Sequence, residues 1–551
     1  MNYILISLLV VVVNFSGSNC LEMFYSSEGT RFSTTPHNGD EGWAARGYFN
    51  NSINSTGFGY LEIETNASHP AETQAFHAGY LEGSLTTSLI HSHWVNVVAP
   101  FCESHDCSTI KSFLKENKEW TRSRMRSVRL GDPYWYQLNL IYLQLSGITR
   151  AYNDKRPDHV PEMSEEDIEM MNLFYELPEI QSIIDSNKTL TKSSKTGGSD
   201  HCSVLIKIIG SNEDVYFGHN TWIHYSAMLR ILKRYIFPYS LTIGDTRVVP
   251  GKEISMSSYP GVVWSVDDFY LISSGLAVTE TTNLVFNETL FKGMTSEGTV
   301  WQGLRAMLAN RLATDGETWH EVFSRFNSGT CNNQYMVVDY NKFTPGEPLP
   351  AGTLWISEQM PGKMVTMDVT DVLVEEGYWS SYNVPYTDEI RRISGYNEKM
   401  LGPDGPWYSY TETPRAKLFK RDHGTVTDME SFMRLMRSND FRNDSLAVCN
   451  CVPAYSGRGA IAAREDLNPE DGVDMNERVP RGAVDAKLTN RQLFSKLQFV
   501  AVAGPTTGTH NQLPVFRWSD SSFSHLPHMS HPDEFNFQPF LMEWSLNKTK
   551  E

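Results

Sequence analysis

Long hydrophobic segments are nearly absent from this sequence of 551 residues. The longest apolar run, Ile4–Val13, is shorter than the roughly 20 residues that a membrane-spanning helix needs, and no other stretch approaches that length. It is followed by the small residues Ser16, Gly17 and Ser18, which is typical of a signal peptide over residues 1–20. The alternative is a membrane anchor, which the short run disfavours. We therefore expect a soluble mature protein with no transmembrane segment.

Metal and nucleotide motifs are also missing. The histidines near the C-terminus, His510, His525, His528 and His531, match neither HExxH nor a paired Cys/His spacing. No GxGxxG or Walker loop stands between an expected strand and an expected helix. We expect no metal and no cofactor.

Basic residues are too few for a nucleic-acid surface. The chain has 47 Lys and Arg against 65 Asp and Glu, a formal net charge of −18. An acidic surface suits an acidic compartment, where protonation reduces self-repulsion. With 40% hydrophobic and 12% aromatic residues, the composition predicts a folded globular protein. The length would suit one large interwoven body.

Only seven cysteines are present, and Cys20 lies in or beside the signal peptide. Two local disulfides are suggested, Cys102 with Cys107 and Cys449 with Cys451, although six cysteines allow fifteen connectivities and the second pair would close a strained ring. Cys202 and Cys331 then have no local partner. Entry into the secretory pathway is also indicated by seven N-glycosylation sequons, at Asn50, Asn54, Asn66, Asn187, Asn287, Asn443 and Asn547.

Cys202 occupies an unusual place for a thiol. The polar, glycine-containing residues 192–201 run directly into a β-branched apolar stretch that begins with Cys202. A short turn, a second strand over 215–220 and a helical pattern over 222–235 follow. Strand, turn and strand would bring His219 and Asn220 close to Cys202.

A cut between His201 and Cys202 would give this thiol a chemical role. The new α-amine, with a pKa near 8, could act as base for the thiol of the same residue. The same thiol could make the cut, through an N-to-S acyl shift and hydrolysis of the thioester. The alternative is that Cys202 is a small buried hydrophobe at a strand start, because cysteine is among the most buried residue types.

A series of short segments resembles the phospholipase B-like (lamina ancestor) family from about Gly42 to about Phe537. In order they are HCSVLIK, FGHNTW, YSAMLRILKRY, SSYPG, WSVDDFY, ETTN, NSGT, NNQ, VVDY, YNVPY, ISGY, PRAKLFKRD and REDLNP. The resemblance implies an α+β fold, the four-layer αββα sandwich of N-terminal-nucleophile hydrolases, with an N-terminal pro-segment woven into it. It implies an N-terminal fragment over 21–184, a flexible cleaved linker over 185–201 and a C-terminal catalytic fragment over 202–551.

The resemblance also implies roles for individual residues. Cleavage would fall between His201 and Cys202, with Cys202 as the nucleophile. His219 would hydrogen-bond the nucleophile or substrate, Thr281 and Asn383 would donate to the oxyanion, and Arg415 would be a buried cation that holds the nucleophile region. Trp222 would line the pocket. Asn332 and Asn333, clustered amides near a strand entry, could line it as oxyanion donors or could merely satisfy turn backbone groups. Without the resemblance, Thr281 would be a routine strand residue, Asn383 a turn residue and Arg415 a surface charge. Most members of the family that the sequence resembles carry tyrosine in place of Cys331, a departure without a physical explanation.

Several elements are expected from patterns alone. Helices are predicted over 109–128, 134–152 and 299–314, strands over 276–282 and 335–340, and strands with turns over 42–83. Asp267 and Asp268 are expected in a strand over 262–273, on opposite faces, with one directed to solvent.

The sequence thus predicts a secreted or lysosomal self-processing hydrolase whose two fragments remain associated. The family name implies release of fatty acids from phospholipid esters. Two alternatives stay open: an amidase acting on N-acyl amide or peptide-like substrates, and a processed glycoprotein that binds a ligand with little turnover.

Overall fold

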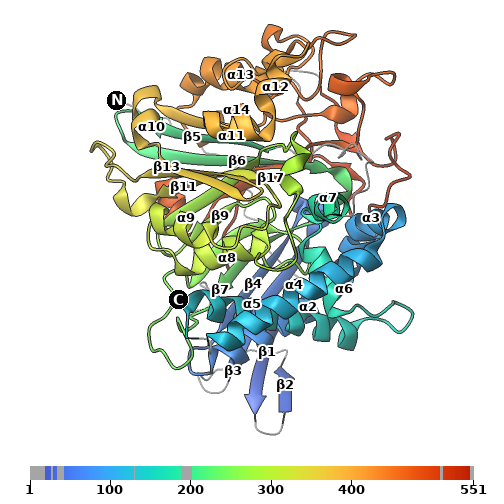
Figure 1. Cartoon of the computed structure of the whole chain (residues 1–551), viewed down its shortest axis with the longest axis vertical. Helices are drawn as coiled ribbons and strands as arrows, with labels where there is room; N and C mark the ends of the chain where they lie inside the picture. Colours follow the sequence, from blue (N-terminus) through green and yellow to red (C-terminus); the bar gives the residue numbers. More distant parts are fainter. Residues whose placement is uncertain are drawn as a thin grey trace, which may run out of the picture.

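The computed structural model describes residues 19–26, 29–33, 43–128, 131–187, 202–508 and 513–545. Two β-sheets lie face to face, and helices cover the outer face of each sheet (Figure 1). The α+β class predicted from the sequence is confirmed. No helix among the described residues combines the length and the apolar character that crossing a membrane requires.

Within the described residues, the larger sheet has eleven strands, in the order β13-β12-β11-β10-β9-β8-β7-β4-β3-β1-β2. Their bounds are β1 (Asn19–Ser26), β2 (Gly29–Ser33), β3 (Trp43–Ser52), β4 (Phe58–Thr65), β7 (Arg230–Ile236), β8 (Glu253–Ser258), β9 (Tyr270–Ile272), β10 (Leu276–Thr282), β11 (Asn333–Asp339), β12 (Leu354–Met360) and β13 (Lys363–Asp368). β4 pairs with β7 in parallel, from Phe58 opposite Arg230 to Glu64 opposite Ile236. N-terminal strands therefore extend a sheet built by the later part of the chain. β1 begins at Asn19, so it overlaps the last two residues of the expected signal peptide.

The smaller sheet carries Cys202. Its strands run in the order β14-β5-β6-β16-β17-β20, with β15 paired to β6 outside this path. Their bounds are β5 (Cys202–Ile209), β6 (Asp214–His224), β14 (Tyr378–Ser381), β15 (Arg481–Ala483), β16 (Asp485–Thr489), β17 (Val500–Ala503) and β20 (Phe540–Leu541). Alternate residues of both sheets, among them Val204, Phe217 and Met336, form one buried apolar core between them.

Helices on the larger sheet come mostly from the N-terminal part of the chain. They are α1 (Ile53–Thr56), α2 (Ala71–His93), α3 (Ala99–Ser104), α4 (Cys107–Ser127), α5 (Pro133–Lys155), α6 (Glu165–Asn172), α7 (Leu177–Asn187), α8 (Gln302–Leu312) and α9 (Gly316–Ser324). α2 and α5 approach most closely at glycines: a Cβ atom on Gly79 would lie 1.8 Å from the carbonyl oxygen of Gln144. The two helices therefore pack backbone against backbone.

Helices over the smaller sheet come from the C-terminal part and are drawn in orange tones in Figure 1. They include α11 (Asp388–Ser394), α12 (Tyr396–Met400), α13 (Pro414–Asp422) and α14 (Met429–Met436). Side chains such as Phe419 and Phe432 meet Leu205 of β5 in a separate apolar cluster. The short helices α10 (Thr370–Glu376) and α15 (Arg491–Phe494) complete the set.

The predicted helix over 222–235 is wrong. β6 continues through Trp222 to His224, and β7 begins at Arg230. The spacing of apolar and charged residues suggested an amphipathic helix, but the charged positions are not solvated. Arg230, Lys233 and Arg234 are at most 3% exposed and pair with buried or half-buried carboxylates. Tertiary ion pairs therefore override the local pattern.

Two further expectations need correction. The region 42–83 holds strands β3 and β4 as predicted, but α2 begins at Ala71 and carries the rest. Asp267 and Asp268 lie in an irregular segment before β9, and both are buried rather than one facing solvent. The predicted helices over 109–128, 134–152 and 299–314 correspond to α4, α5 and α8, and the strands over 276–282 and 335–340 correspond to β10 and β11.

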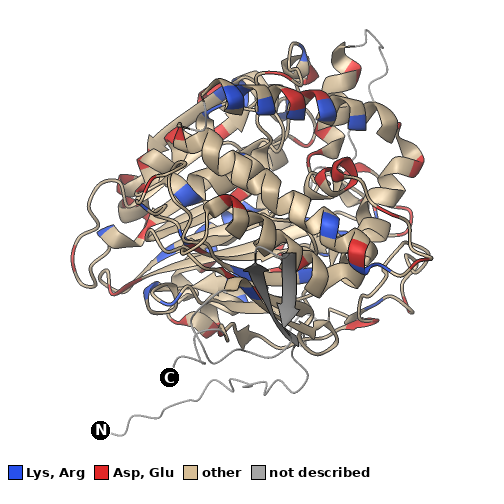
Figure 2. Cartoon of the chain, turned by 90° about the horizontal axis from the view of Figure 1, so that it is seen from below, with Lys and Arg blue, Asp and Glu red and all other residues tan. Residues whose placement is uncertain are grey.

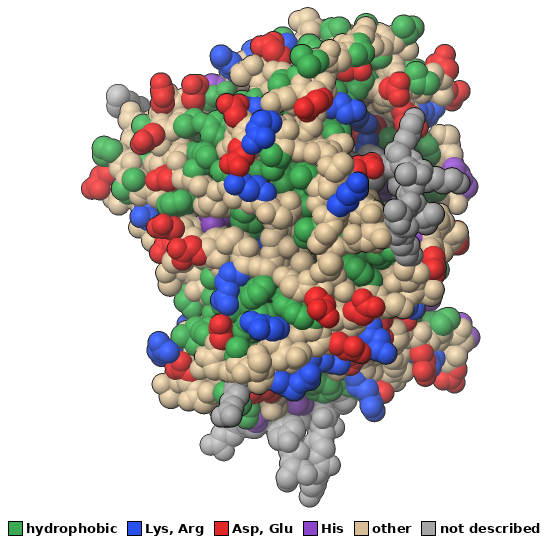
Figure 3. Space-filling view, in the orientation of Figure 1, with side chains coloured by type: hydrophobic (Ala, Val, Ile, Leu, Met, Phe, Trp, Pro, Cys, Tyr) green, Lys and Arg blue, Asp and Glu red, His purple; other side chains and the backbone are tan. Residues whose placement is uncertain are grey.

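Charged residues of both signs are interspersed over the described elements (Figure 2). The face shown in Figure 3 likewise carries acidic, basic and hydrophobic side chains side by side, without one broad basic area.

Candidate active site

Cys202 is the first residue of β5, in the pairing that the sequence predicted. The β5–β6 register places Cys202 opposite Thr221 and Val204 opposite His219. Residues two apart on a strand share a face, so Cys202 and His219 are diagonal neighbours on the same side of the sheet. The thiol is 2% exposed and is not in a disulfide. The pairing that would have excluded a nucleophile is therefore not formed.

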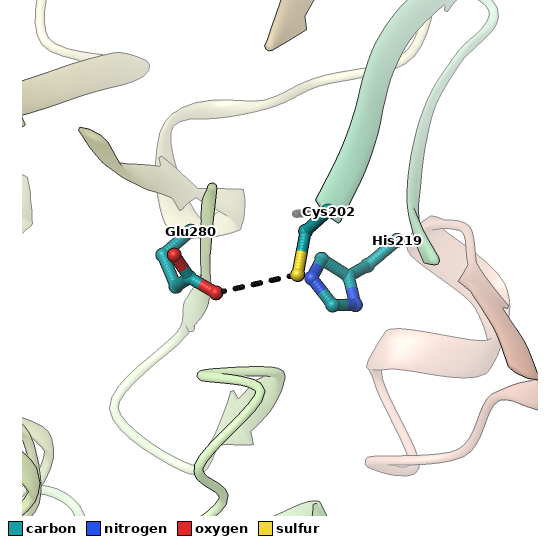
Figure 4. A group of neighbouring side chains, drawn as sticks. All are labelled: Cys202, His219 and Glu280. Atoms are coloured by element: carbon teal, nitrogen blue, oxygen red, sulfur yellow. Dashed lines mark hydrogen bonds between the residues drawn. The ribbon is translucent and has the colours of Figure 1, made fainter. Parts of the chain in front are cut away.

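The sulfur lies between a carboxylate and an imidazole (Figure 4). Cys202 Sγ donates to Glu280 Oε1 at 3.6 Å, and one ligand atom each from Cys202, His219 and Glu280 lie within 4.8 Å of one another. Glu280 comes from β10 of the larger sheet, so the three groups meet between the two sheets. Thiolate, imidazole and carboxylate are also the ligand types that bind zinc. Among the described residues, these three are the group that could hold a divalent cation.

Burial dominates the ionisation of all three groups. It raises the pKa of the Cys202 thiol well above its usual value, and the neighbouring Glu280 carboxylate raises it further. It also raises the pKa of Glu280 well above its usual value, with Asp268 adding to the effect. The pKa of His219 is well below its usual value because of burial and the nearby Lys487 ammonium. The site thus favours a thiol, a neutral imidazole and a carboxyl group that resists ionisation.

Arg415 holds the backbone of Cys202. From α13 its Nη1 donates to the carbonyl oxygen of Cys202 at 2.6 Å and to Ser203 Oγ at 3.2 Å. Its Nη2 donates to the carbonyl oxygen of Tyr382 at 2.8 Å and to Asn383 Oδ1 at 2.6 Å. The guanidinium lies 4.2 Å from the ring centre of Trp222, which is a favourable cation–π contact. Arg415 is buried, which rules out the alternative of a surface charge.

Asn383 is bound from both ends of its amide. Its Nδ2 donates to the carbonyl oxygen of Thr282 at 2.7 Å, and its Oδ1 accepts from Arg415. Its φ of 68° lies in the left-handed region, which asparagine tolerates better than most residues. Asn383 and Arg415 line a small cavity of about 70 Å³ together with Tyr382, Trp407 and other residues. Asn383 is therefore a buried part of a cavity wall.

The other predicted residues are directed elsewhere. Thr281 shares a hydrogen bond with Ser381 of β14. Asn332 Nδ2 donates to Glu179 Oε1 at 2.9 Å, and Asn333 Nδ2 donates to the Tyr335 hydroxyl at 3.0 Å. Trp222 packs beneath Arg415. None of these four residues lines the cavity beside Asn383 in the described part of the chain.

The sequence alone did not indicate Glu280 as a site residue, nor the buried charged residues that lie next to His219. Arg230 pairs with Asp267 and Asp485, and Lys487 Nζ lies 2.9 Å from Asp485 Oδ2. Lys487 stands opposite His219 in the β16–β6 register. A lone carboxylate within the apolar strand 276–282 was the available signal for Glu280, because a buried acid in such a strand needs a partner.

The cysteines and sequons occupy varied positions. Cys102–Cys107 and Cys449–Cys451 form disulfides, and Cys202 and Cys331 are free. The side chains of Asn54, Asn187 and Asn443 are exposed, and those of Asn66 and Asn287 are partly buried. Asn50 is 8% exposed within β3, so a glycan there would have to displace its neighbours. Asn547 and His201 lie outside the described residues.

Comparison with known proteins identifies the family. The family model described as phospholipase B matches residues 45–542. The chain belongs to the phospholipase B-like family. Relatives named "Putative phospholipase B-like 2" from Homo sapiens and Caenorhabditis elegans are 39% and 40% identical to it, each over 90% of this chain and 85% and 84% of their own length.

More distant similarities lie within and beyond this family. "Phospholipase B-like protein B" of Dictyostelium discoideum is 35% identical over 90% of this chain and 84% of its own length. In structure, a conjugated bile acid hydrolase of Clostridium perfringens is similar to this phospholipase B-like chain with a TM-score of 0.30 and 11% identity, over 62% of this chain and 97% of that protein.

Proposed function

We propose that this phospholipase B-like protein is a self-processing hydrolase of the N-terminal-nucleophile type. It would cut its own chain between His201 and Cys202 and then use the Cys202 thiol to cleave acyl esters of phospholipids. We further propose that it acts in the secretory pathway, in the lysosome or after secretion, and that its two fragments stay together.

One observation carries the proposal: a free buried thiol at a strand start is surrounded by groups that suit acyl transfer. Arg415 fixes the carbonyl of Cys202, and the same guanidinium orients the amide of Asn383. A cysteine that only fills the core behaves as a small hydrophobe, whereas Cys202 has the carboxyl group of Glu280, the imidazole of His219 and the guanidinium of Arg415 around it. These polar groups cost free energy to bury, which favours a chemical role over a packing role.

The turnover step follows from the same geometry. After the cut, the α-amine of Cys202 takes the thiol proton, and the thiolate attacks the ester carbonyl. Asn383 Nδ2 has a second N–H beyond the one used on Thr282, and it can donate to the oxyanion that forms. Water then hydrolyses the thioester and releases the fatty acid.

Substrate access requires the site to open. The cavity of about 70 Å³ beside Asn383 is much smaller than the roughly 300 Å³ at the lower end of ligand pockets. With Cys202 2% exposed, the uncut chain is a closed precursor. Trp407, Tyr408 and Met475 in the cavity wall would form the apolar entrance for an acyl chain.

The test is intact-mass and N-terminal analysis of the secreted protein. The wild type should yield a fragment that begins at Cys202, and Cys202→Ala should remain uncut and inactive. Cys331→Ala removes the second buried free thiol of the described residues and should be cut normally. Incubation with phosphatidylcholine vesicles and with an N-acyl amide, followed by mass analysis for a thioester on Cys202, would distinguish ester from amide substrates.

Two results would contradict the proposal. A Cys202→Ala chain that is still cut before position 202 would exclude self-processing by this thiol. A wild type that is cut but forms no thioester with either substrate would favour a binding protein.

A further inference from the structure

The cut between His201 and Cys202 cannot use the α-amine of Cys202 as its base, because the cut itself creates that amine. Before the cut, the nitrogen of Cys202 belongs to a peptide bond and has no basic lone pair. The thiol of the uncut chain therefore needs a proton acceptor from elsewhere in the fold. This question rests on the proposed function, because it concerns the self-processing step.

Glu280 is the acceptor that the uncut structure provides. Cys202 Sγ donates to its Oε1 at 3.6 Å, while Oε2 has no hydrogen-bond partner among the described residues. The carboxyl group is 1% exposed, so the lone pairs of Oε2 are not satisfied by bulk water. Burying a carboxyl oxygen without a hydrogen-bond partner costs free energy. Such a cost at this position favours a functional role for Glu280.

We propose that the Glu280 carboxylate is the catalytic base of self-cleavage and that it is dispensable for later turnover. The role is separate from the family's hydrolytic chemistry, since it ends once the α-amine of Cys202 is released.

The step balances as follows. The Cys202 thiol gives its proton to Glu280, and the sulfur forms a bond to the carbonyl carbon of His201. The bond between that carbon and the Cys202 nitrogen breaks, and the nitrogen takes the proton from Glu280 to become an amine. Water then adds to the thioester, the carbon–sulfur bond breaks, and the products are a carboxyl group on His201 and the Cys202 thiol. Glu280 is an unprotonated carboxylate again at the end of the reaction.

His219 is less suited to this step, although it is the other neighbour of the sulfur. Burial and the nearby Lys487 and Arg230 cations lower the pKa of His219 and disfavour a positively charged imidazolium, and Asp267 opposes them only in part. Glu280 is surrounded by acids and by groups that resist losing protons: Asp267 and Asp268 precede β9, and Cys331 and Tyr335 lie at or near β11. Lys487 on β16 is the cation that acts on it. Burial, with Asp268 and Asp267 adding to it, raises the pKa of Glu280 well above its usual value, which makes its carboxylate a stronger base.

The first experiment follows the cut in full-length chains captured soon after synthesis. Glu280→Gln keeps the shape of the side chain and removes the base, and it should slow cleavage at least about 100-fold. Glu280→Asp keeps the charge but moves it by one methylene, and it should show an intermediate rate. Thr279→Val is the matched control in the same strand: Thr279 is buried and its hydroxyl has no hydrogen-bond partner among the described residues. It should be cut like the wild type.

A second arm separates cleavage from turnover and from misfolding. Ile-Glu-Gly-Arg in place of residues 198–201 lets factor Xa cut directly before Cys202. After this cut, Glu280→Gln should form the Cys202 thioester within about threefold of the wild type treated in the same way. Recovery of activity would also show that the variant is folded.

The pH dependence of the cleavage rate distinguishes a base from a residue that only supports the fold, because a purely structural role of Glu280 would not change its shape. The wild-type rate should rise with pH and level off once Glu280 is ionised. In Glu280→Gln the slow remaining rate depends on the small thiolate fraction, so it should rise about tenfold per pH unit without levelling off.

The outcomes are distinct. A wild type that is never cut overturns both this inference and the proposed function. A Glu280→Gln chain that is cut at the wild-type rate overturns this inference alone. So does a Glu280→Gln chain that stays inactive after factor Xa, because Glu280 would then be needed for turnover or folding.

Discussion

At the residue scale, the site could be predicted in part. Cys202 and His219 follow from a local pattern of strand, turn and strand, and the register confirms their proximity. Asn383 and Arg415 were indicated by resemblance, since nothing in a turn or a helix start marks them. Glu280 lies 78 residues after Cys202 and reaches it across two sheets, so no local pattern could connect the two. Sheet-to-sheet contacts of this kind are set by the whole fold.

Asn383 provides a prediction at this scale. Asn383→Asp keeps the oxygen that accepts from Arg415 and tolerates the positive φ, but it loses the N–H groups. The turnover number of the factor Xa-activated enzyme should fall about 100- to 1000-fold, and the melting temperature should also fall, because a carboxylate oxygen replaces the N–H that donates to the Thr282 carbonyl. Single-turnover kinetics would check this. A normal turnover number would remove Asn383 from the oxyanion site.

At the element scale, the amphipathic pattern succeeded where one face is solvated and failed where it is not. α4 carries exposed charges along one side and was predicted within two residues of its bounds. β7 contains Arg230, Lys233 and Arg234 in the interior, and the same spacing suggested a helix. A pattern cannot distinguish a solvated charge from a buried ion pair, because the partner is far away in the chain.

The contact between α2 and α5 gives a prediction for this scale. Gly79→Ala would place a methyl group 1.8 Å from the Gln144 carbonyl oxygen and force the helices apart. We expect the free energy of unfolding to fall by at least about 2 kcal/mol, although alanine normally favours a helix.

Urea denaturation of the uncut Cys202→Ala chain would measure this change. Gly424→Ala is the control, because a Cβ atom there meets nothing within 4 Å, and it should change the value by less than about 0.5 kcal/mol. Equal effects of the two substitutions would argue against close backbone packing.

At the scale of the whole molecule, buried acids should link stability to pH. Burial raises the pKa of Glu169 and Glu179 to about 7 and that of Asp268 to about 8. Their unfolded values are near 4, so between about pH 4 and pH 8 the folded state binds more protons than the unfolded state. The sign follows: stability is highest on the acid side of this window and declines as pH rises through it.

Glu169→Gln tests this linkage. Glu169 is 3% exposed, neither carboxylate oxygen has a hydrogen-bond partner among the described residues, and Lys118 Nζ lies 3.7 Å from Oε2 as an ion-pair partner. The variant should lose less stability between pH 5 and pH 8 than the parent, by up to about 3 kcal/mol. Glu103→Gln makes the same charge change at an exposed position and should leave the slope unchanged. Melting temperatures of the parent and of both variants, measured across this pH range, would test the linkage.

The parallel pairing of β4 with β7 has a consequence for the product of the cut. Each disulfide described above joins two cysteines on the same side of position 202. The mature protein would then be a non-covalent heterodimer of two fragments of one chain, with a continuous seven-residue hydrogen-bonded ladder as one part of its subunit interface. Neither subunit would need to find its partner by diffusion. The two edge strands would already be paired when the precursor folds, before the cut makes two chains.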